Sequence, residues 1–337
     1  MSRIALDRLR ALVAAALVNA NTSPANARSV AAALVAAEID GQKGHGLSRV
    51  ASYAAQARCG KVNGQAVPLA AQVRPAAVVV DAADGFAYPA IDLAVERLSA
   101  LAPQAGVAAA AIHHSHHFGV AGRHVERLAE RGLVALAFGN SPKAIAPWGG
   151  TSAVFGTNPI AFAAPRAKAP ALVIDLSLSK VARGRIMAAA QKGEPIPEGW
   201  ALDRDGKPTT DAKSALDGIM LPLGDAKGAA LALMVEILAA ALTASHLGFE
   251  ASSFFTAEGP PPRVGQFFLA IDPEPLSAGA FAGRLETLLG TVLAQPGVRL
   301  PGQKRLDGRA RSAPGALDVD EKTLAEIEKL AGEEGKG

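Results

Sequence analysis

The chain has 337 residues, of which 50% are hydrophobic and 19% are charged. This composition is typical of a globular protein with a large core and excludes a disordered chain. The net charge of +3 is too small to indicate a nucleic-acid partner, and no basic stripe with interleaved aromatic residues is present. A single cysteine, Cys59, excludes an internal disulfide and favours a reducing, cytoplasmic location.

Two segments could be considered as a signal peptide or a transmembrane helix, and the sequence of each argues against that role. Residues 1–7 carry charges and look like the start of an amphipathic helix rather than a signal peptide. The longest apolar run, residues 228–242, is interrupted by Glu236 and is too short and too rich in alanine to span a bilayer. We therefore expect a buried helix there and no membrane partner.

The first 64 residues predict three helices. Ser23 and Pro24 supply an N-cap and a first-turn proline for the second helix, which should run to about Asp40. The third should begin near His45 and end at Cys59. Strands are then expected at residues 78–81, 106–113, 133–138, 159–163, 171–176 and 266–272, and helices at 88–101, 120–131, 225–247 (the longest), 281–294 and 320–331. Strands that alternate with helices indicate an α/β protein.

His45 and Arg49 form the pair that most suggests chemistry. Their i, i+4 spacing would place them on one helix face, and Gly44 and Gly46 would let a ligand approach the backbone. An arginine fork matches a carboxylate, and a histidine can give a proton to a nascent alkoxide or amine. A helix N-terminus would lower the pKa of this histidine. The alternative is a surface helix start with a solvated arginine.

Four histidines, at positions 113, 114, 116 and 117, invite a metal site. No acidic or cysteine ligand lies nearby at helix spacing, and alternate residues at a strand end point to opposite faces, so we expect no metal. The segment should instead form a turn before a helix that starts near Val120. The amides of this helix, helped by Gly119 and Gly122, would hold an anion such as a cofactor phosphate. A turn with buried imidazoles is the alternative.

Weaker signals lie further along the chain. Thr157 follows a turn and could donate its hydroxyl to a substrate. Asp175 and Ser177 at a strand end could contact a ribose or phosphate, or Ser177 could simply cap a helix. The basic turn at residues 300–305 could clamp a phosphate or be a solvated loop. Residues 224–228 are not a P-loop, and no Gly-x-Gly-x-x-Gly joins a strand to a helix, so any dinucleotide must bind without the Rossmann fingerprint.

In their order and spacing, several segments resemble the malate/L-lactate dehydrogenase family that is unrelated to the Rossmann-type enzymes. The resemblance runs from about residue 5 to residue 330. The matching segments are Gly-His-Gly-Leu-Ser-Arg at 44–49, Ser-His-His-Phe-Gly at 115–119, Phe-Gly-Thr-Asn-Pro-Ile-Ala-Phe at 155–162, Pro-Glu-Gly-Trp-Ala at 197–201 with Pro-Thr-Thr-Asp at 208–211, Lys-Gly at 227–228, and Leu-Pro-Gly at 300–302.

The resemblance implies an NAD(P)-dependent oxidoreductase that forms a homodimer. Its α/β fold would have a mixed, mainly antiparallel sheet packed on helical N- and C-terminal segments. Residues 1–72 and 225–337 would form a helical region for substrate binding and dimerisation, and residues 73–224 a central α/β region with the cofactor domain. No metal is implied.

The resemblance also assigns residues to roles. His45 would be the proton donor, and the substrate contacts would be Arg49, Thr157, Arg183 and Gly184. The cofactor contacts would be His117, Phe118, Gly119, Val120, Ala121, Asp175, Leu176, Ser177, Ala226, Lys227, Pro301, Gly302, Lys304 and Arg305.

Two positions depart from the family pattern. Many relatives carry serine before the histidine, where this chain has Gly44. The cyclic-imine reductases place an acid, part of a relay to the histidine, where this chain has Arg185. A relay through those side chains is therefore not available. The arginine also favours a more anionic substrate, such as a dicarboxylate or a sulfonate-carboxylate.

The expected activity is hydride transfer between a nicotinamide and C2 of a small 2-oxo/2-hydroxy acid of the malate, lactate or sulfolactate type. The cofactor would be NADP or NAD, with a slight preference for NADPH. The alternative is NADPH-dependent reduction of a cyclic 2-imino acid, pyrroline-2-carboxylate or piperideine-2-carboxylate. Two other classes remain as rivals, a metal-dependent hydrolase built on the histidine cluster and a non-catalytic binding protein.

Overall fold

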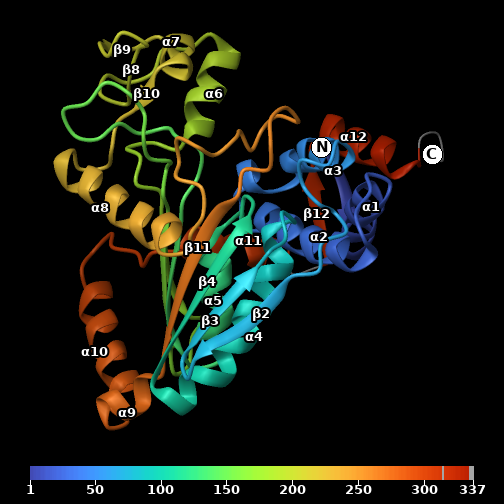
Figure 1. Ribbon diagram of the computed structural model, residues 1–337. Helices are drawn as coiled ribbons and strands as arrows, with labels where there is room; N and C mark the ends of the chain where they lie inside the picture. The colour runs from blue at the N-terminus through green and yellow to red at the C-terminus, as the bar shows by residue number, and fades with distance from the viewer. Residues whose placement is uncertain (313–314, 334–337) are drawn as a thin grey trace.

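A seven-stranded sheet forms the centre of the computed structural model, which describes residues 1–312 and 315–333 (Figure 1). The strand order is β2 (Leu69–Arg74), β3 (Ala77–Asp81), β4 (Val107–Ser115), β11 (Val264–Ile271), β5 (Val134–Gly139), β6 (Ile160–Ala164) and β7 (Leu172–Leu176). Within this sheet only β3 and β4 pair in parallel, and all other neighbours are antiparallel. The expected mixed, mainly antiparallel sheet is confirmed.

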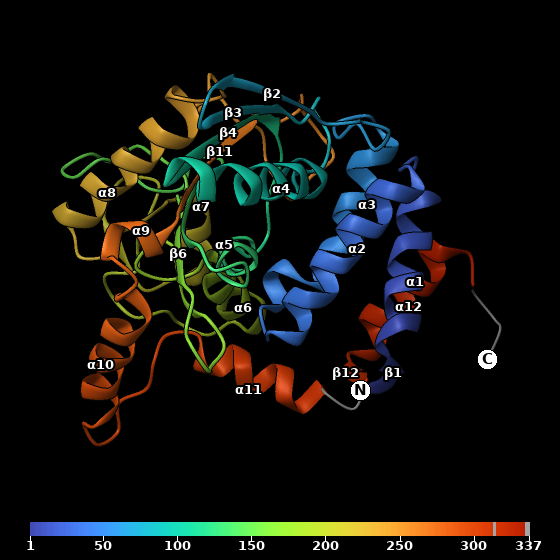
Figure 2. The same ribbon diagram turned by 90° about the horizontal axis from the view of Figure 1, so that it is seen from below.

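The sheet is covered on both faces. On one face, the core contains α4 (Ala87–Ala105) and α5 (Ala121–Ala129), which lie on the same side of the sheet in Figure 2. On the other face pack α8 (Ala226–Glu236) and the π-helical turn Ile237–Ala241 that continues it. Strand alternation separates the two cores, because Phe268 belongs to the first and its neighbour Phe267 packs against the second. The small side chains of β4 let α4 approach the sheet closely.

The two chain ends meet in a helical lobe beside the sheet (Figures 1 and 2). This lobe contains α1 (Leu6–Val18), α2 (Pro24–Ile39), α3 (Val50–Arg58) and α12 (Glu321–Ala331) around one apolar core. The short strand β1 (Ser2–Ala5) pairs antiparallel with β12 (Ala316–Val319). As the sequence predicts, the hydroxyl of Ser23 caps α2 by accepting a hydrogen bond from the amide of Asn26.

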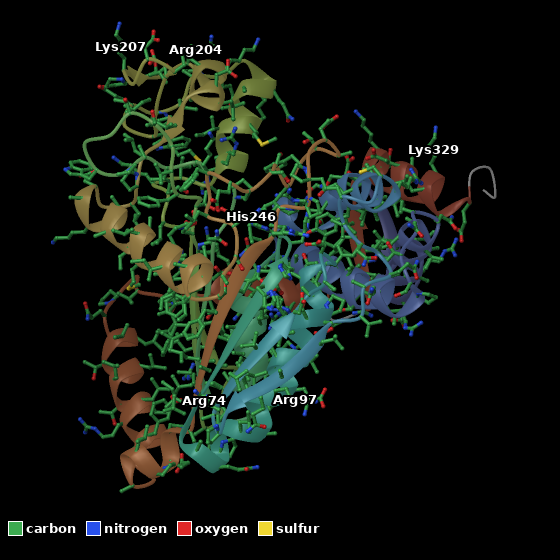
Figure 3. All side chains as sticks on the ribbon, viewed as in Figure 1. Arg74, Arg97, Arg204, Lys207, His246 and Lys329 are labelled. Carbon is green, nitrogen blue, oxygen red and sulfur yellow. The ribbon has the colours of Figure 1, made fainter. Side chains whose placement is uncertain are left out.

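A small lobe with its own apolar core stands at one end of the sheet. It is built from α6 (Arg183–Lys192), β8 (Ala201–Leu202), β9 (Pro208–Thr209), α7 (Ala212–Asp217) and β10 (Ile219–Met220). Figure 3 shows Arg204 and Lys207 at its tip, at the opposite end of the molecule from Arg74 and Arg97. The remaining helices are α9 (Pro273–Ser277), α10 (Phe281–Leu293) and α11 (Gln303–Ser312). No helix among the described residues is long and apolar enough to cross a membrane.

Most predicted strands and helices are present, but several predictions are wrong. The chain begins with a strand instead of a helix, and the basic turn expected at 300–305 leads directly into α11. The third helix begins at Val50 rather than near His45. The helix predicted for 225–247 already ends in the π-helical turn at Ala241. The longest helix is therefore α4 and not this one. The helix predicted for 225–247 is buried on one face only: Ala232 and Val235 pack in the core, whereas Leu233 and Ile237 are exposed.

An arginine on α11 joins the helical lobe to the sheet. Arg309 binds the carboxylate of Asp40, at the end of α2, at 2.7 and 2.9 Å, and that of Glu126, on α5, at 2.8 and 2.7 Å. Both carboxylates are almost fully buried. Burial raises the pKa of Glu126, but hydrogen bonds from Arg309 and nearby arginines outweigh it and hold the pKa below its usual value. The buried carboxylates therefore need this arginine as a partner.

We predict that Arg309→Ala lowers the free energy of unfolding by about 3 kcal/mol, because it leaves two buried carboxylates without their main partner. Urea denaturation monitored by circular dichroism would measure the change. Arg3→Ala is the matched control, since Arg3 and Asp318 form an exposed ion pair at 3.5 Å, which should contribute less than about 1 kcal/mol. Equal stability of the two variants would contradict this role of Arg309.

Candidate active site

His45 lies in a compact double turn between α2 and α3. The 3-10 turns Lys43–His45 and Leu47–Arg49 meet at Gly46, and the amide of Leu47 donates to the carboxylate of Glu38 at 3.0 Å. A β-carbon on Gly46 would lie 2.3 Å from that carboxylate, so the close approach requires glycine. His45 and Arg49 therefore do not share an α-helical face, as their spacing suggested. Arg49 is held beside His45 because its Nε donates to the carbonyl of Gly44 at 2.7 Å.

A chain of hydrogen bonds runs inward from His45. Its Nδ1 lies 3.0 Å from Nε2 of His117, and the two rings stack with centroids 5.1 Å apart. Nδ1 of His117 lies 2.6 Å from the hydroxyl of Tyr53, which lies 3.2 Å from the hydroxyl of Tyr88. His117, Tyr53 and Tyr88 are all buried. The structure thus brings His45 together with His117, which the sequence assigned to the cofactor.

Burial controls the protonation of these groups. It lowers the pKa of His45 to about 4, with a smaller contribution from the charge of Arg49. The helix terminus expected to lower this pKa is absent, since α3 begins five residues later. Burial also places the pKa of His117 well below its usual value and raises the pKa of Tyr53 to about 12. At pH 7 the whole chain of groups is therefore neutral.

The guanidinium of Arg49 has a donor that a ligand could use. The side chain is buried, and its Nη1 has no hydrogen-bond partner within the described residues. Its Cζ lies 4.3 Å from the centre of the Phe255 ring. The loop that carries Phe255 is fixed by Lys61, whose Nζ donates to the carbonyls of residues 253, 256 and 258. An unpaired donor of this kind is costly unless a ligand completes it, and a carboxylate fits the fork.

A second group of predicted residues meets where α5, β7 and α11 come together. The amide of Gly122 donates to Asp175 at 2.8 Å, and burial raises the pKa of that carboxyl. A β-carbon on Gly302 would touch the carbonyl of Val173 and the guanidinium of Arg305. Asp175 thus occupies an amide at the N-terminus of α5 that the sequence analysis offered to a phosphate. Gly119 is needed here for its φ of +68° and for its contact with Tyr88.

A third group connects Thr157 to the start of α8. The carbonyl of Thr157 accepts from the amide of Leu178, whose carbonyl accepts from the amide of Leu223, both at 2.8 Å. These bonds bring Ser177 and the exposed Ala226–Lys227 step to the same region as Thr157. The amide of Thr157 donates to Ser141 at 3.0 Å.

Glu236 organises this third group and was missed by the sequence analysis. One carboxylate oxygen accepts from Asn158 at 2.7 Å, and the other accepts from the amide of Gly248 at 2.7 Å and lies 3.2 Å from the amide nitrogen of Asn140. The carboxylate is almost fully buried. The sequence did offer one sign of this role, because Glu236 is a lone acid within an apolar helix. A carboxylate is costly to bury without hydrogen-bond partners, so partners should have been expected.

Arg183 and Gly184 remain apart from the His45 group. Arg183 donates to the carbonyl of Leu216 at 3.1 Å inside the small lobe, and Gly184 borders open space. No hydrogen bond or ion pair joins either of them to His45 in the part of the chain that the structure describes. Arg185 is exposed, and a β-carbon on Gly44 would meet nothing within 4 Å, so a serine would fit there.

The fold is that of a class of dehydrogenases and reductases. The chain belongs to the malate/L-lactate dehydrogenase family, whose profile matches residues 4–328. It is an NAD(P)-dependent oxidoreductase that acts on a small molecule.

Individual relatives sharpen this assignment. The chain is 52% identical over 332 residues to (2R)-3-sulfolactate dehydrogenase (NADP(+)) of Chromohalobacter salexigens, covering 98% of this chain and 99% of the relative. It is 40% identical over 335 residues to a Δ1-pyrroline-2-carboxylate/Δ1-piperideine-2-carboxylate reductase of Pseudomonas putida, covering 98% and 97%. Among solved structures, Δ1-piperideine-2-carboxylate reductase of Pseudomonas syringae matches with a TM-score of 0.93 at 39% identity, covering 98% of this chain and 100% of the other.

We predict that stability falls steeply as the pH drops from 7 to 5. Burial lowers the pKa of His45 and His124 to about 4 and that of His116 to about 3, whereas the unfolded value is about 6.5. Between those values the unfolded chain binds more protons, so each histidine can remove up to about 1.4 kcal/mol per pH unit. Urea denaturation at several pH values would measure the slope. Constant stability across this window would contradict the burial of neutral imidazoles.

Proposed function

We propose that this oxidoreductase reversibly transfers a hydride between the nicotinamide and C2 of a small 2-oxo/2-hydroxy acid that carries a second anionic group. The observation that carries the proposal is the buried Nη1 of Arg49, which has no partner in the described part of the chain and lies beside a histidine with a free ring edge. The fork of Arg49 would bind the C1 carboxylate and hold the C2 oxygen near Nε2 of His45. Thr157, Arg183 and Gly184 would contact the remainder of the substrate.

The hydrogen-bonded chain behind His45 suits a donor that must work in both directions. If Tyr53 donates to His117 and His117 donates to Nδ1 of His45, the proton of His45 lies on Nε2, ready for the substrate oxygen. If every donor in the chain is reversed, Nε2 becomes an acceptor for the hydroxyl proton of the reduced substrate. His117 and Tyr53 would thus take over the positioning that a serine and an acid provide in some relatives.

The residues expected to bind the cofactor fit a phosphorylated dinucleotide. Nε of Arg305 is buried without a hydrogen-bond partner among the described residues, while Lys227 and Lys304 are exposed cations. These groups would hold phosphates, and the partly buried Asp175 would accept a ribose hydroxyl. When bound, the nicotinamide supplies or removes the hydride. We propose NADPH over NADH, supported by the 52% identical relative that is named for NADP.

The substrate proposed first is of the sulfolactate or malate type. It is supported by the same relative and by the cation at Arg185 in place of an acid. The second candidate is a cyclic 2-imino acid, supported by the reductase of Pseudomonas putida at 40% identity. The same donor and the same carboxylate fork would serve either substrate.

We further propose a cytoplasmic homodimer. The exposed face of α8 and the turn after it carries apolar side chains that a second copy would cover, namely Leu231, Leu233, Met234, Ile237 and Leu242. The single cysteine suits a reducing compartment. Residues 1–72 and 225–337 would serve substrate binding and dimerisation, and residues 73–224 the cofactor; of these, 313–314 and 334–337 lie outside the described residues. The sheet itself crosses this division, since β2 begins at Leu69 and β11 supplies its central strand.

We predict that NADPH oxidation is fastest with sulfopyruvate or oxaloacetate in a panel that also contains pyruvate and the five- and six-membered cyclic imino acids. His45→Ala should lower kcat by about 10²–10⁴-fold, because the proton donor is lost, and leave NADPH binding unchanged by fluorescence titration. His246→Gln, which alters a histidine outside this group, is the control (Figure 3). A fully active His45→Ala variant would refute the donor role, and preference for an imino acid would select the second substrate.

We predict that Arg49→Lys raises KM for the acid by about 10–100-fold, with a smaller change in kcat, because an ammonium cannot replace the bidentate fork. Steady-state kinetics at saturating NADPH would measure both parameters. Arg58→Lys, on the exposed side of α3, is the matched control and should leave KM unchanged. An unaltered KM in Arg49→Lys would remove Arg49 from the carboxylate site.

A further inference from the structure

A second cluster of ionisable side chains lies outside the His45 group, at the ends of two neighbouring strands. Asp81 ends β3, and His113 and His114 lie near the end of β4. The parallel register of these strands places Asp81 directly opposite His113. The proposed reaction uses none of these three side chains, so their convergence requires another explanation.

The ligand-type atoms of this cluster lie within bonding range of one centre. Nδ1 of His114 is 3.1 Å from Nδ1 of His113 and 3.0 Å from a carboxylate oxygen of Asp81. All three atoms lie within 4.8 Å of one another. The side chains of His114 and Asp81 are 39% and 40% exposed, which leaves room for an ion and its water ligands.

The backbone of His114 departs from strand geometry in the way that this convergence needs. Its φ is +48°, in the left-handed region that a histidine adopts at a cost of roughly 1 kcal/mol. A regular strand would point consecutive side chains to opposite faces, which is why the sequence analysis expected no metal. The left-handed residue brings both rings to one side, with centroids 4.4 Å apart. The sequence around the histidines offered no acidic ligand, and the structure supplies one, Asp81, from the adjacent strand β3.

Hydrogen bonding alone does not satisfy the three atoms. A neutral imidazole carries one N–H, so a proton on Nδ1 of His114 can point at Asp81 or at His113 but not well at both. One of the two close approaches is therefore left with facing lone pairs or a strongly bent bond. A cation at the centre would accept all three lone pairs at once.

We propose that Asp81, His113 and His114 bind a divalent transition-metal ion, with Zn²⁺ as the best match. Two imidazoles and one carboxylate with an open fourth position form a zinc ligand set. Zn–N bonds of about 2.0 Å in a tetrahedron place ligand atoms about 3.3 Å apart. The separations of His114 from His113 and from Asp81 therefore need to open by a few tenths of an ångström, while Asp81 and His113 need to move closer together. The nearby cation Arg263 is paired with Asp84 at 2.9 and 2.8 Å, and that pairing offsets its charge.

The bound ion would brace the segment that leads to the proposed active site. The amides of Ala82 and Asp84 donate to the carbonyls of His113 and His114 at 3.0 Å, so the turn after β3 is already tied to the end of β4. The chain reaches His117 three residues after His114. An ion held by both strands would resist their separation and keep the backbone before His117 in place.

The test is Zn²⁺ binding by isothermal titration calorimetry after chelator treatment of the full-length protein. We expect one equivalent with Kd of about 10 µM or tighter, together with a rise in Tm on adding zinc. Asp81→Asn and His114→Asn should each weaken binding at least 10-fold and abolish the rise in Tm. Asparagine tolerates the left-handed backbone at position 114, so the variant should fold, and its Tm without metal checks this. His246→Gln should bind as the parent does.

The outcomes separate this site from other zinc-binding groups. If zinc binding survives in both variants but is lost in His45→Ala, the ion lies between His45 and His117, and the proposal is wrong. Absence of binding below about 100 µM in the parent protein also overturns it. Neither result depends on the substrate or cofactor assigned to the enzyme, so the metal site and the proposed function can fail separately.

Discussion

The buried contact of Arg309 with Asp40 and Glu126 is the constraint on which the arrangement of the site depends. Asp40 is the C-cap residue of α2, three residues before the turns that carry His45 begin, and Glu126 lies within α5, which begins four residues after His117. Arg309 itself holds α11, at whose start Gly302 and Arg305 approach β7. One guanidinium thus sets the relative positions of the three segments that surround the proposed chemistry.

Removal of water explains the electrostatics of the site. The imidazoles of His45 and His117 have low pKa values mainly because they are buried, and the cation of Arg49 adds to this effect. A substrate carboxylate that paired with Arg49 would offset that cation and make His45 easier to protonate in the complex than in the free enzyme. Binding and proton transfer are then coupled through the same arginine.

Sequence patterns were sufficient for the framework and insufficient for the contacts between distant segments. Periodicity and turn residues located α2, α4, α5 and most strands of the sheet, because apolar spacing and glycine or proline act locally. The predicted start of α3 was too early. Glu38, seven residues before His45, accepts a hydrogen bond from the amide of Leu47, and this contact favours a 3-10 turn at Leu47–Arg49 in place of the first turn of the helix. The contact between His45 and His117 spans 72 residues, and no local pattern could reveal it. Glu236 was hidden for the same reason, since its partners lie in three separate loops.

The placement of the chain's late segments has a consequence for how the protein is made. β11 lies between β4 and β5, so the sheet is completed only after residue 271 has been synthesised. β1 must wait still longer for its partner β12, at residues 316–319. During translation the apolar faces of the early strands, and the side of α1 that packs against α12, would therefore stay uncovered for most of the synthesis time. Such a chain should fold slowly after release and need protection from aggregation, because both the sheet and the helical lobe are closed by contacts of long sequence separation.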